Sequence, residues 1–158
     1  MKKILIFGTG FIATSLIEYF QNKDKTIECI VLYNKHKIEG FPNIRQFSMN
    51  DDIERLLSKE KPNYIVLLHG NSFVSNNTNI KSSSNDNMLK SAFFLEKLYE
   101  KKFYENIEKI IVVGSASEYG KFYDKPIKEN FTLHPTSLYG LSKIFLYNAS
   151  NYFIERGL

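Results

Sequence analysis

The chain has 158 residues, a length that suits one domain with a sizeable core. Its content of 43% hydrophobic and 15% aromatic residues excludes a disordered chain and predicts a globular protein. The formal net charge is +4, but the lysines stand singly and in pairs among Glu and Asp rather than in a basic arm. We therefore interpret the charge as solvated surface and expect no nucleic-acid partner.

The apolar stretches of the sequence are short. The longest, at residues 65–68 and 110–113, have the length of strands and fall far below the roughly 20 residues that cross a bilayer. The N-terminal run at residues 4–7 is too short for the core of a signal peptide. We expect no transmembrane helix and no membrane partner, and we predict a cytoplasmic location.

Short β-rich apolar runs alternate with longer amphipathic segments along the chain. The predicted strands are residues 3–7, 26–33, 44–47, 64–69 and 109–113. Three helices are predicted between them from apolar residues at helical spacing: Ile12, Leu16, Tyr19 and Phe20; Ile53, Leu56 and Leu57; and Met88, Ala92, Leu95 and Tyr99. A fourth helix is predicted from about Ser137 to Phe153, with Gly157 as its stop. This alternation predicts an α/β fold with a Rossmann-like, doubly wound parallel sheet.

Two polar stretches, residues 71–87 and 121–135, follow the fourth and fifth predicted strands. The first is rich in Ser and Asn, and the second contains two prolines, so both are predicted to be mostly loop. Because parallel sheets bind ligands at the carboxyl ends of their strands, we expect both loops at the ligand-binding edge.

A glycine-rich turn, Gly8-Thr9-Gly10-Phe11-Ile12-Ala13, joins the first predicted strand to the first helix. Glycines in this context allow a tight turn and let a pyrophosphate approach the helix N-terminus, while Ala13 fills the third, packing-limited position. We therefore favour a dinucleotide-binding domain over residues 1–158, with Gly8, Gly10, Phe11 and Ile12 as cofactor-binding residues. A plain strand-to-helix turn is the alternative.

The end of the second predicted strand bears on the choice of cofactor. A carboxylate usually stands there to hold the adenosine ribose of NAD, but Tyr33-Asn34-Lys35-His36-Lys37 contains none. Lys35 or Lys37 could pair with a 2′-phosphate, so we narrowly favour NADP over NAD. The alternative is that both are ordinary surface lysines.

Three residues form a candidate catalytic group. Ser115 stands just past the fifth predicted strand, and Tyr139 and Lys143 lie at i and i+4 on one helix face. Hydride transfer at a carbinol carbon needs a group that moves the proton on its oxygen, and a phenol of ordinary pKa, about 10, is too weak an acid unless an ammonium lies close. Lys143 would stabilise the tyrosinate and bond the nicotinamide ribose, while Ser115 holds the substrate oxygen. No metal is expected.

The alternative for Tyr139 and Lys143 is an exposed helical pair. The same Tyr-x-x-x-Lys spacing occurs at Tyr19/Lys23 and Tyr33/Lys37, where neither context suggests a function. The order of the motifs along the chain and their context therefore favour a functional role for Tyr139 and Lys143.

The sequence resembles the extended short-chain dehydrogenase/reductase family, in its nucleotide-sugar epimerase/dehydratase group, over residues 1–158. The glycine turn resembles the family's Gly-x-Gly-x-x-Gly/Ala loop, Gly114-Ser115-Ala116-Ser117-Glu118-Tyr119-Gly120 its Ser-containing segment, and Pro135-Thr136-Ser137-Leu138-Tyr139-Gly140-Leu141-Ser142-Lys143 its catalytic helix. The resemblance implies an NAD(P)-dependent oxidoreductase or isomerase with Ser115 as catalytic hydroxyl, Tyr139 as acid/base and Lys143 on the cofactor ribose. It also implies a nucleotide-sugar substrate and a structural Asn87 at the start of a helix.

The sequence departs from the family pattern at several positions. Ala116 and Ser117 replace the polar or acidic residue and Glu of sugar dehydratases, which favours epimerisation or keto-reduction. Ser48-Met49 replaces an Asp-hydrophobic pair, and His69-Gly70-Asn71-Ser72 replaces small apolar residues near the expected nicotinamide site. Two interpretations of His69 stay open: a catalytic group, or a histidine that is hydrogen-bonded to the backbone.

Family members continue with a C-terminal domain that holds the sugar nucleotide, so the resemblance implies a domain that is incomplete at its C-terminal end. Two functions follow: an epimerase or keto-reductase, or a non-catalytic dinucleotide-binding module. The family's usual pairing of two helices across a dimer suggests a homodimer through Phe93, Phe94, Phe145 and Tyr152, with core packing as the alternative.

Overall fold

The computed structural model describes residues 1–70, 88–120 and 126–158. These residues form two compact units. The first, which we call the sheet unit, comprises Met1–His69 and Lys97–Val113, and the second, the helical unit, comprises Gly70–Glu96 and Gly114–Leu158. The predicted loop at 71–87, with Asn87, and residues 121–125 of the other loop lie outside the described residues.

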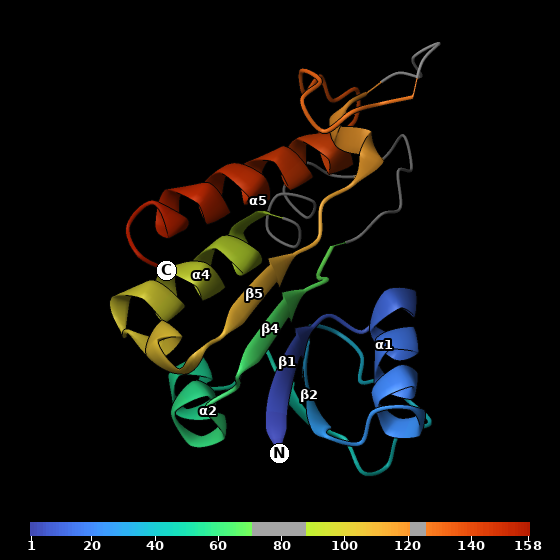
Figure 1. Cartoon of the computed structure of the whole chain (residues 1–158), viewed down its shortest axis with the longest axis vertical. Helices are drawn as coiled ribbons and strands as arrows, with labels where there is room; N and C mark the ends of the chain where they lie inside the picture. The colour runs from blue at the N-terminus through green and yellow to red at the C-terminus, as the bar shows by residue number, and fades with distance from the viewer. Residues whose placement is uncertain (71–87, 121–125) are drawn as a thin grey trace. The chain divides into compact units, whose positions relative to one another are not determined.

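The sheet unit is built on five parallel strands in the order β3-β2-β1-β4-β5 (Figure 1). Their bounds are β1 Lys2–Phe7, β2 Ile27–Tyr33, β3 Arg45–Ser48, β4 Tyr64–Leu67 and β5 Lys109–Val112. The parallel α/β sheet predicted from the sequence is therefore confirmed. β1 pairs with β2 on one side and with β4 on the other. The strands are therefore added in one direction from β1 to β3 and in the opposite direction from β4 to β5, and the strand order switches beside β1. Ligands of open α/β sheets bind at such a switch point.

Strand boundaries differ from the predicted ones by one or two residues. Thr26 lies outside β2, because its N–H and hydroxyl both donate to the Asp24 carboxylate and hold a turn. β4 ends at Leu67 rather than at His69.

Helices cover both faces of this sheet. Figure 1 shows α1 (Phe11–Asn22) to one side and α2 (Ile53–Glu60) to the other. Ile4 and Ile6 of β1 belong to a core cluster with Ala13 and Ile17 of α1. The intervening β1 residues, which point to the opposite face, are also fully buried. A strand that is buried on both faces reads as a continuous apolar run, which is why β1 shows no alternation.

Further elements complete the sheet unit. The helix α4 (Lys90–Glu100) has its last turn here, followed by the short 3-10 helix η2 (Phe103–Asn106). Glu54 of α2 accepts ion pairs from Lys97 at 3.2 Å and from Lys101 at 3.5 Å, which ties α4 to α2. The single cysteine, Cys29, is a buried core residue, and burial raises the pKa of its thiol to about 11.

The helical unit contains the 3-10 helix η3 (Ala116–Glu118) and the helix α5 (Leu138–Ile154), which pack against each other. The predicted fourth helix and its stop are confirmed. Ser137 caps the start of α5 by accepting the Gly140 N–H at 3.1 Å. At the end, the N–H groups of Gly157 and Leu158 bond back to Ile154 and Phe153 in a Schellman pattern, and Gly157 supplies the left-handed φ of 100°.

Exposure distinguishes the residues considered for a dimer contact. Phe94 is 1% exposed, so it belongs to the core and is not available to a partner. Phe93 and Tyr152 are 57% and 52% exposed. Among the described residues, no helix has both the length and the apolar character needed to cross a bilayer.

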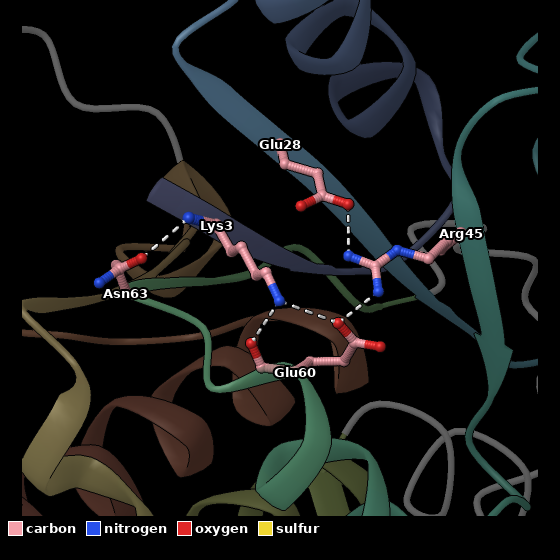
Figure 2. A network of polar contacts seen from close by, with 5 residues as sticks. All are labelled: Lys3, Glu28, Arg45, Glu60 and Asn63. Atoms are coloured by element: carbon pink, nitrogen blue, oxygen red, sulfur yellow. Dashed lines mark hydrogen bonds and ion pairs between the residues drawn. The ribbon is translucent and has the colours of Figure 1, made fainter. Parts of the chain in front are cut away.

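A charged network ties three strands to α2 (Figure 2). Glu60 ends α2 with a side chain that is 1% exposed, and its Oε2 accepts from Arg45 Nη1 at 2.5 Å and from Lys3 Nζ at 3.3 Å. Arg45 also pairs with Glu28 of β2. On β1, the Lys3 N–H donates to Asn63 Oδ1 at 2.9 Å. The network thus joins β1, β2, β3 and α2 through two cations and two carboxylates.

Replacing Arg45 with Met is expected to lower the free energy of unfolding by about 2 kcal/mol. The buried Glu60 carboxylate would lose its shorter ion pair. The loss of stability should stay below the roughly 3–5 kcal/mol of breaking a fully buried ion pair, because the Arg45 side chain is 39% exposed. Urea unfolding measures the change. The control is Arg55→Met, at an exposed position on α2, with an expected change within about 0.5 kcal/mol. Equal stability of the two variants would show that the network contributes nothing.

Candidate cofactor and catalytic site

The glycine turn leaves β1 in a conformation that requires glycine at its first position. Gly8 has φ of 132°, and its N–H continues the ladder to β2 by donating to Leu32 O at 3.0 Å. A Cβ at Gly8 would lie 3.2 Å from the carbonyl carbon of Leu68 and from the N of His69. The backbone angle and the close approach of the chain after β4 therefore both exclude a side chain here.

Neither the backbone angle of Gly10 nor a contact with the described residues requires glycine at this position. Gly10 caps α1 with an ordinary φ of −81°, and a Cβ there would meet no atom of the described residues within 4 Å. No side chain caps α1, and no acidic residue stands in its first turn. Phe11 and Ile12, the first residues of the helix, are 86% and 57% exposed. The described residues therefore leave the first N–H groups of α1 uncapped, which fits the pyrophosphate of a dinucleotide.

Basic rather than acidic side chains follow β2. Tyr33 pairs in register with Ser48 of β3, and the Lys37 ammonium lies 5.8 Å from the centroid of the Tyr33 ring. Lys35 is exposed. After β3, the carboxylate of Asp51 accepts the Ser48 N–H at 2.7 Å, so it holds the turn there.

His69 lies at the switch point. Its ring stacks on Phe7, with centroids 5.0 Å apart and planes at 10°. Phe7 is fully buried at the end of β1, so the imidazole is held flat against the strand that leads into the glycine turn. A catalytic role for His69 stays a prediction.

Ser115 is held by its own turn in the helical unit. Its side chain accepts the Ser117 N–H at 3.2 Å, and Glu118 Oε1 accepts the Ser115 N–H at 2.5 Å, which together form a capping box around η3. Within the described ranges no group accepts the Ser115 O–H. The hydroxyl can therefore donate to a ligand.

Tyr139 and Lys143 lie one turn apart on α5. The Lys143 ammonium lies 5.9 Å from the centroid of the Tyr139 ring. The Lys143 residue is 5% exposed. Burial lowers the pKa of Lys143, and the charge of Glu118 opposes that effect. The Tyr139 phenol makes no hydrogen bond to the part of the chain that the structure describes, and none joins it to Ser115.

Two residues of this arrangement were missed in the sequence. Glu118 stands three residues after Ser115, the spacing of a capping box, and that spacing could have identified it. Gly140, a glycine inside a helix, also signals a packing requirement. A Cβ there would lie 2.3 Å from Ser117 O, so η3 and α5 meet at backbone distance. No cluster of three or more His, Cys, Asp or Glu able to hold a metal ion occurs among residues 1–70, 88–120 and 126–158.

The strand order 3-2-1-4-5, with a glycine turn opening the first helix at the switch point, defines a Rossmann-type nucleotide-binding fold. The chain belongs to the NAD dependent epimerase/dehydratase family, whose model matches residues 4–157.

Curated relatives and solved structures are similar to the chain, the latter in their fold. The chain is 27% identical over 162 residues to a UDP-glucose 4-epimerase of Pisum sativum, covering 92% of this chain and 45% of that protein. Its fold is similar to a UDP-glucose 4-epimerase of Thermotoga maritima with UDP-glucose, at a TM-score of 0.82 and 23% identity over 97% of this chain and 51% of the other. It is also similar to a dTDP-glucose 4,6-dehydratase of Bacillus anthracis in complex with NAD, at a TM-score of 0.80 and 20% identity over 99% and 52%. The chain thus spans about half the length of these proteins.

Proposed function

We propose that this chain binds NADP or NAD at the glycine turn and serves an epimerase or keto-reductase that acts on a nucleotide sugar. Ser115, Tyr139 and Lys143 form its proton relay. The observation that carries the proposal is the burial of Lys143 beside Tyr139, because a lysine is almost never fully buried without a partner or a task. An ordinary surface pair would leave the amine in water.

Each side chain has a distinct task in the relay. The Ser115 O–H donates to the substrate oxygen and orients it. Tyr139 takes the proton from that oxygen or returns it, and the Lys143 ammonium stabilises the tyrosinate formed in between. The nicotinamide, when bound, accepts or supplies the hydride at the carbon.

A non-catalytic dinucleotide-binding module is the second candidate. The glycine turn is compatible with it, because a turn of this kind binds a dinucleotide without any catalytic residue. The full set of Ser115, Tyr139 and Lys143 opposes it, because a module that only binds the cofactor could use Lys143 on the ribose but would need neither the hydroxyl nor the phenol.

The absence of a carboxylate in residues 33–37 supports NADP over NAD, and Lys35 and Lys37 could meet its 2′-phosphate. Fluorescence titrations of the chain with NADPH and NADH compare the two directly. We expect NADPH to bind more tightly, and NADH binding at least about tenfold tighter would refute this preference.

Replacing Gly10 with Ala tests the cofactor site. No atom of the described residues lies within 4 Å of the added methyl group, so the thermal midpoint should change by no more than a few degrees. The methyl would stand where the pyrophosphate approaches, so dinucleotide affinity should fall by at least about tenfold. The control is Ser15→Ala, at an exposed position of α1, which should keep wild-type affinity. Unchanged affinity in the Gly10 variant would place the cofactor elsewhere.

A further inference from the structure

Glu118 is a buried carboxylate that the proposed relay does not use. It is 8% exposed, and a carboxylate is rarely so buried unless something pairs with it. Its Oε1 accepts the Ser115 N–H at 2.5 Å. A Cβ at Gly114 would lie 2.7 Å from that same oxygen, so the glycine makes room for the carboxylate. The chain is thus built locally around Glu118.

The turn that carries Glu118 also lies directly against α5. The Ser117 carbonyl approaches Gly140 so closely that a Cβ there would be 2.3 Å from its oxygen. Gly140 stands between Tyr139 and Lys143, so the capped turn meets α5 at the turn that bears the relay. Across this contact the negative charge of Glu118 raises the pKa of Lys143, against the larger lowering effect of burial.

We propose that Glu118 is a positioning residue of the relay: its carboxylate holds the backbone of Ser115 where η3 packs against the turn of α5 that bears Tyr139 and Lys143. This inference rests on the proposed function of the three residues. One side chain would then set both the direction of the hydroxyl and the charge state of the amine, which the relay needs together.

Other described titratable groups near this contact are engaged elsewhere or exposed. The Tyr119 hydroxyl donates to Glu129 O at 3.4 Å, and His134, which is exposed, donates its backbone N–H to Glu118 O at 3.0 Å. On α5, Tyr139 is half-buried and Tyr147 is exposed. Glu118 is therefore the buried acidic group on the two packed elements.

Glu118→Gln separates charge from capping, because the amide oxygen can still accept the Ser115 N–H while the charge is removed. The readout is the titration midpoint of Lys143, followed by NMR in the chain labelled with ¹³C at the lysine ε-carbons. The Lys143→Met variant assigns the signal. We expect the Lys143 midpoint to fall to lower pH in Glu118→Gln, with little change in thermal midpoint. Glu129→Gln, at an exposed carboxylate of the same unit, should leave the midpoint at the wild-type pH.

An unchanged Lys143 midpoint in Glu118→Gln would overturn the inference and leave Glu118 a capping residue. Glu118→Ala should lower the midpoint as well and also destabilise the turn, but the conclusion does not depend on that variant folding. In an active preparation, the alkaline limb of the pH–rate profile, where the Lys143 ammonium is lost, should move to lower pH in Glu118→Gln, which a capping role alone would not cause. The NMR titration requires no bound cofactor. Failure of the proposed function would therefore appear separately, as a wild type that binds no dinucleotide.

Discussion

On the proposed relay, replacing Tyr139 with Phe is expected to lower the rate of the proposed nucleotide-sugar reaction by about 10²–10⁴-fold, the contribution that a positioned acid–base group commonly makes. The ring is kept, and the phenol makes no hydrogen bond to the described residues, so packing and stability should change little. Dinucleotide affinity should also stay near the wild-type value, because the variant removes only the group that moves the proton. Steady-state kinetics beside an NAD(P)H titration measures both quantities.

The sequence provides a matched control for this variant. Tyr19 and Lys23 have the same spacing, but both are exposed on or just after α1. Tyr19→Phe should therefore leave the rate unchanged. A Tyr139→Phe variant that retains the wild-type rate would exclude the relay, and one that loses cofactor affinity in proportion to its rate would make Tyr139 a binding residue.

Replacing Gly140 with Ala is expected to destabilise the chain by about 2–3 kcal/mol. In an open helix the same change would stabilise by about 1 kcal/mol, because Gly is the poorer helix former. Here the added Cβ would lie 2.3 Å from the oxygen and 2.9 Å from the carbon of the Ser117 carbonyl. Both atoms are backbone, so no side-chain rotation relieves the clash, and η3 must move away from α5.

Chemical denaturation measures the effect, with Asn148→Ala as the control because Asn148 is exposed on the same helix. That control should be neutral or slightly stabilising. On the proposed function, the Gly140 variant should also lose activity, since moving η3 would shift Ser115 relative to Tyr139 and Lys143. Wild-type stability in Gly140→Ala would show that the contact between η3 and α5 is not maintained in solution.

Local chemistry accounts for what could be predicted of the fold. The strands of the sheet and the extent of α5 follow from the period of apolar residues, from the Ser137 cap and from the Gly157 stop, all of which act within a few residues of chain. Gly8 adopts a φ of 132°, which other residues avoid, so glycine is required there. The turn could therefore be recognised from its glycines in the sequence. Thr26 was misassigned to a strand because its bonds to Asp24 compete locally with the sheet.

Tertiary packing decided what local chemistry left open. The three Tyr-x-x-x-Lys pairs are alike in sequence, yet Lys23 and Lys37 are exposed while Lys143 is 5% exposed. Burial depends on which surface covers a side chain, and residues far along the chain supply that surface. The same holds for Phe94, which is a core residue rather than a candidate interface residue.

By itself, the sequence determined the α/β sheet, the glycine turn and the family to which the chain belongs, because periodicity, special backbone angles and motif spacing are written in neighbouring residues. Only the tertiary structure decided that Glu118 and Lys143 are buried and that the Ser117 carbonyl packs against Gly140 of α5. Those relations depend on two segments folding against each other, and the desolvation and electrostatic interaction of a charge exist only once that contact has formed.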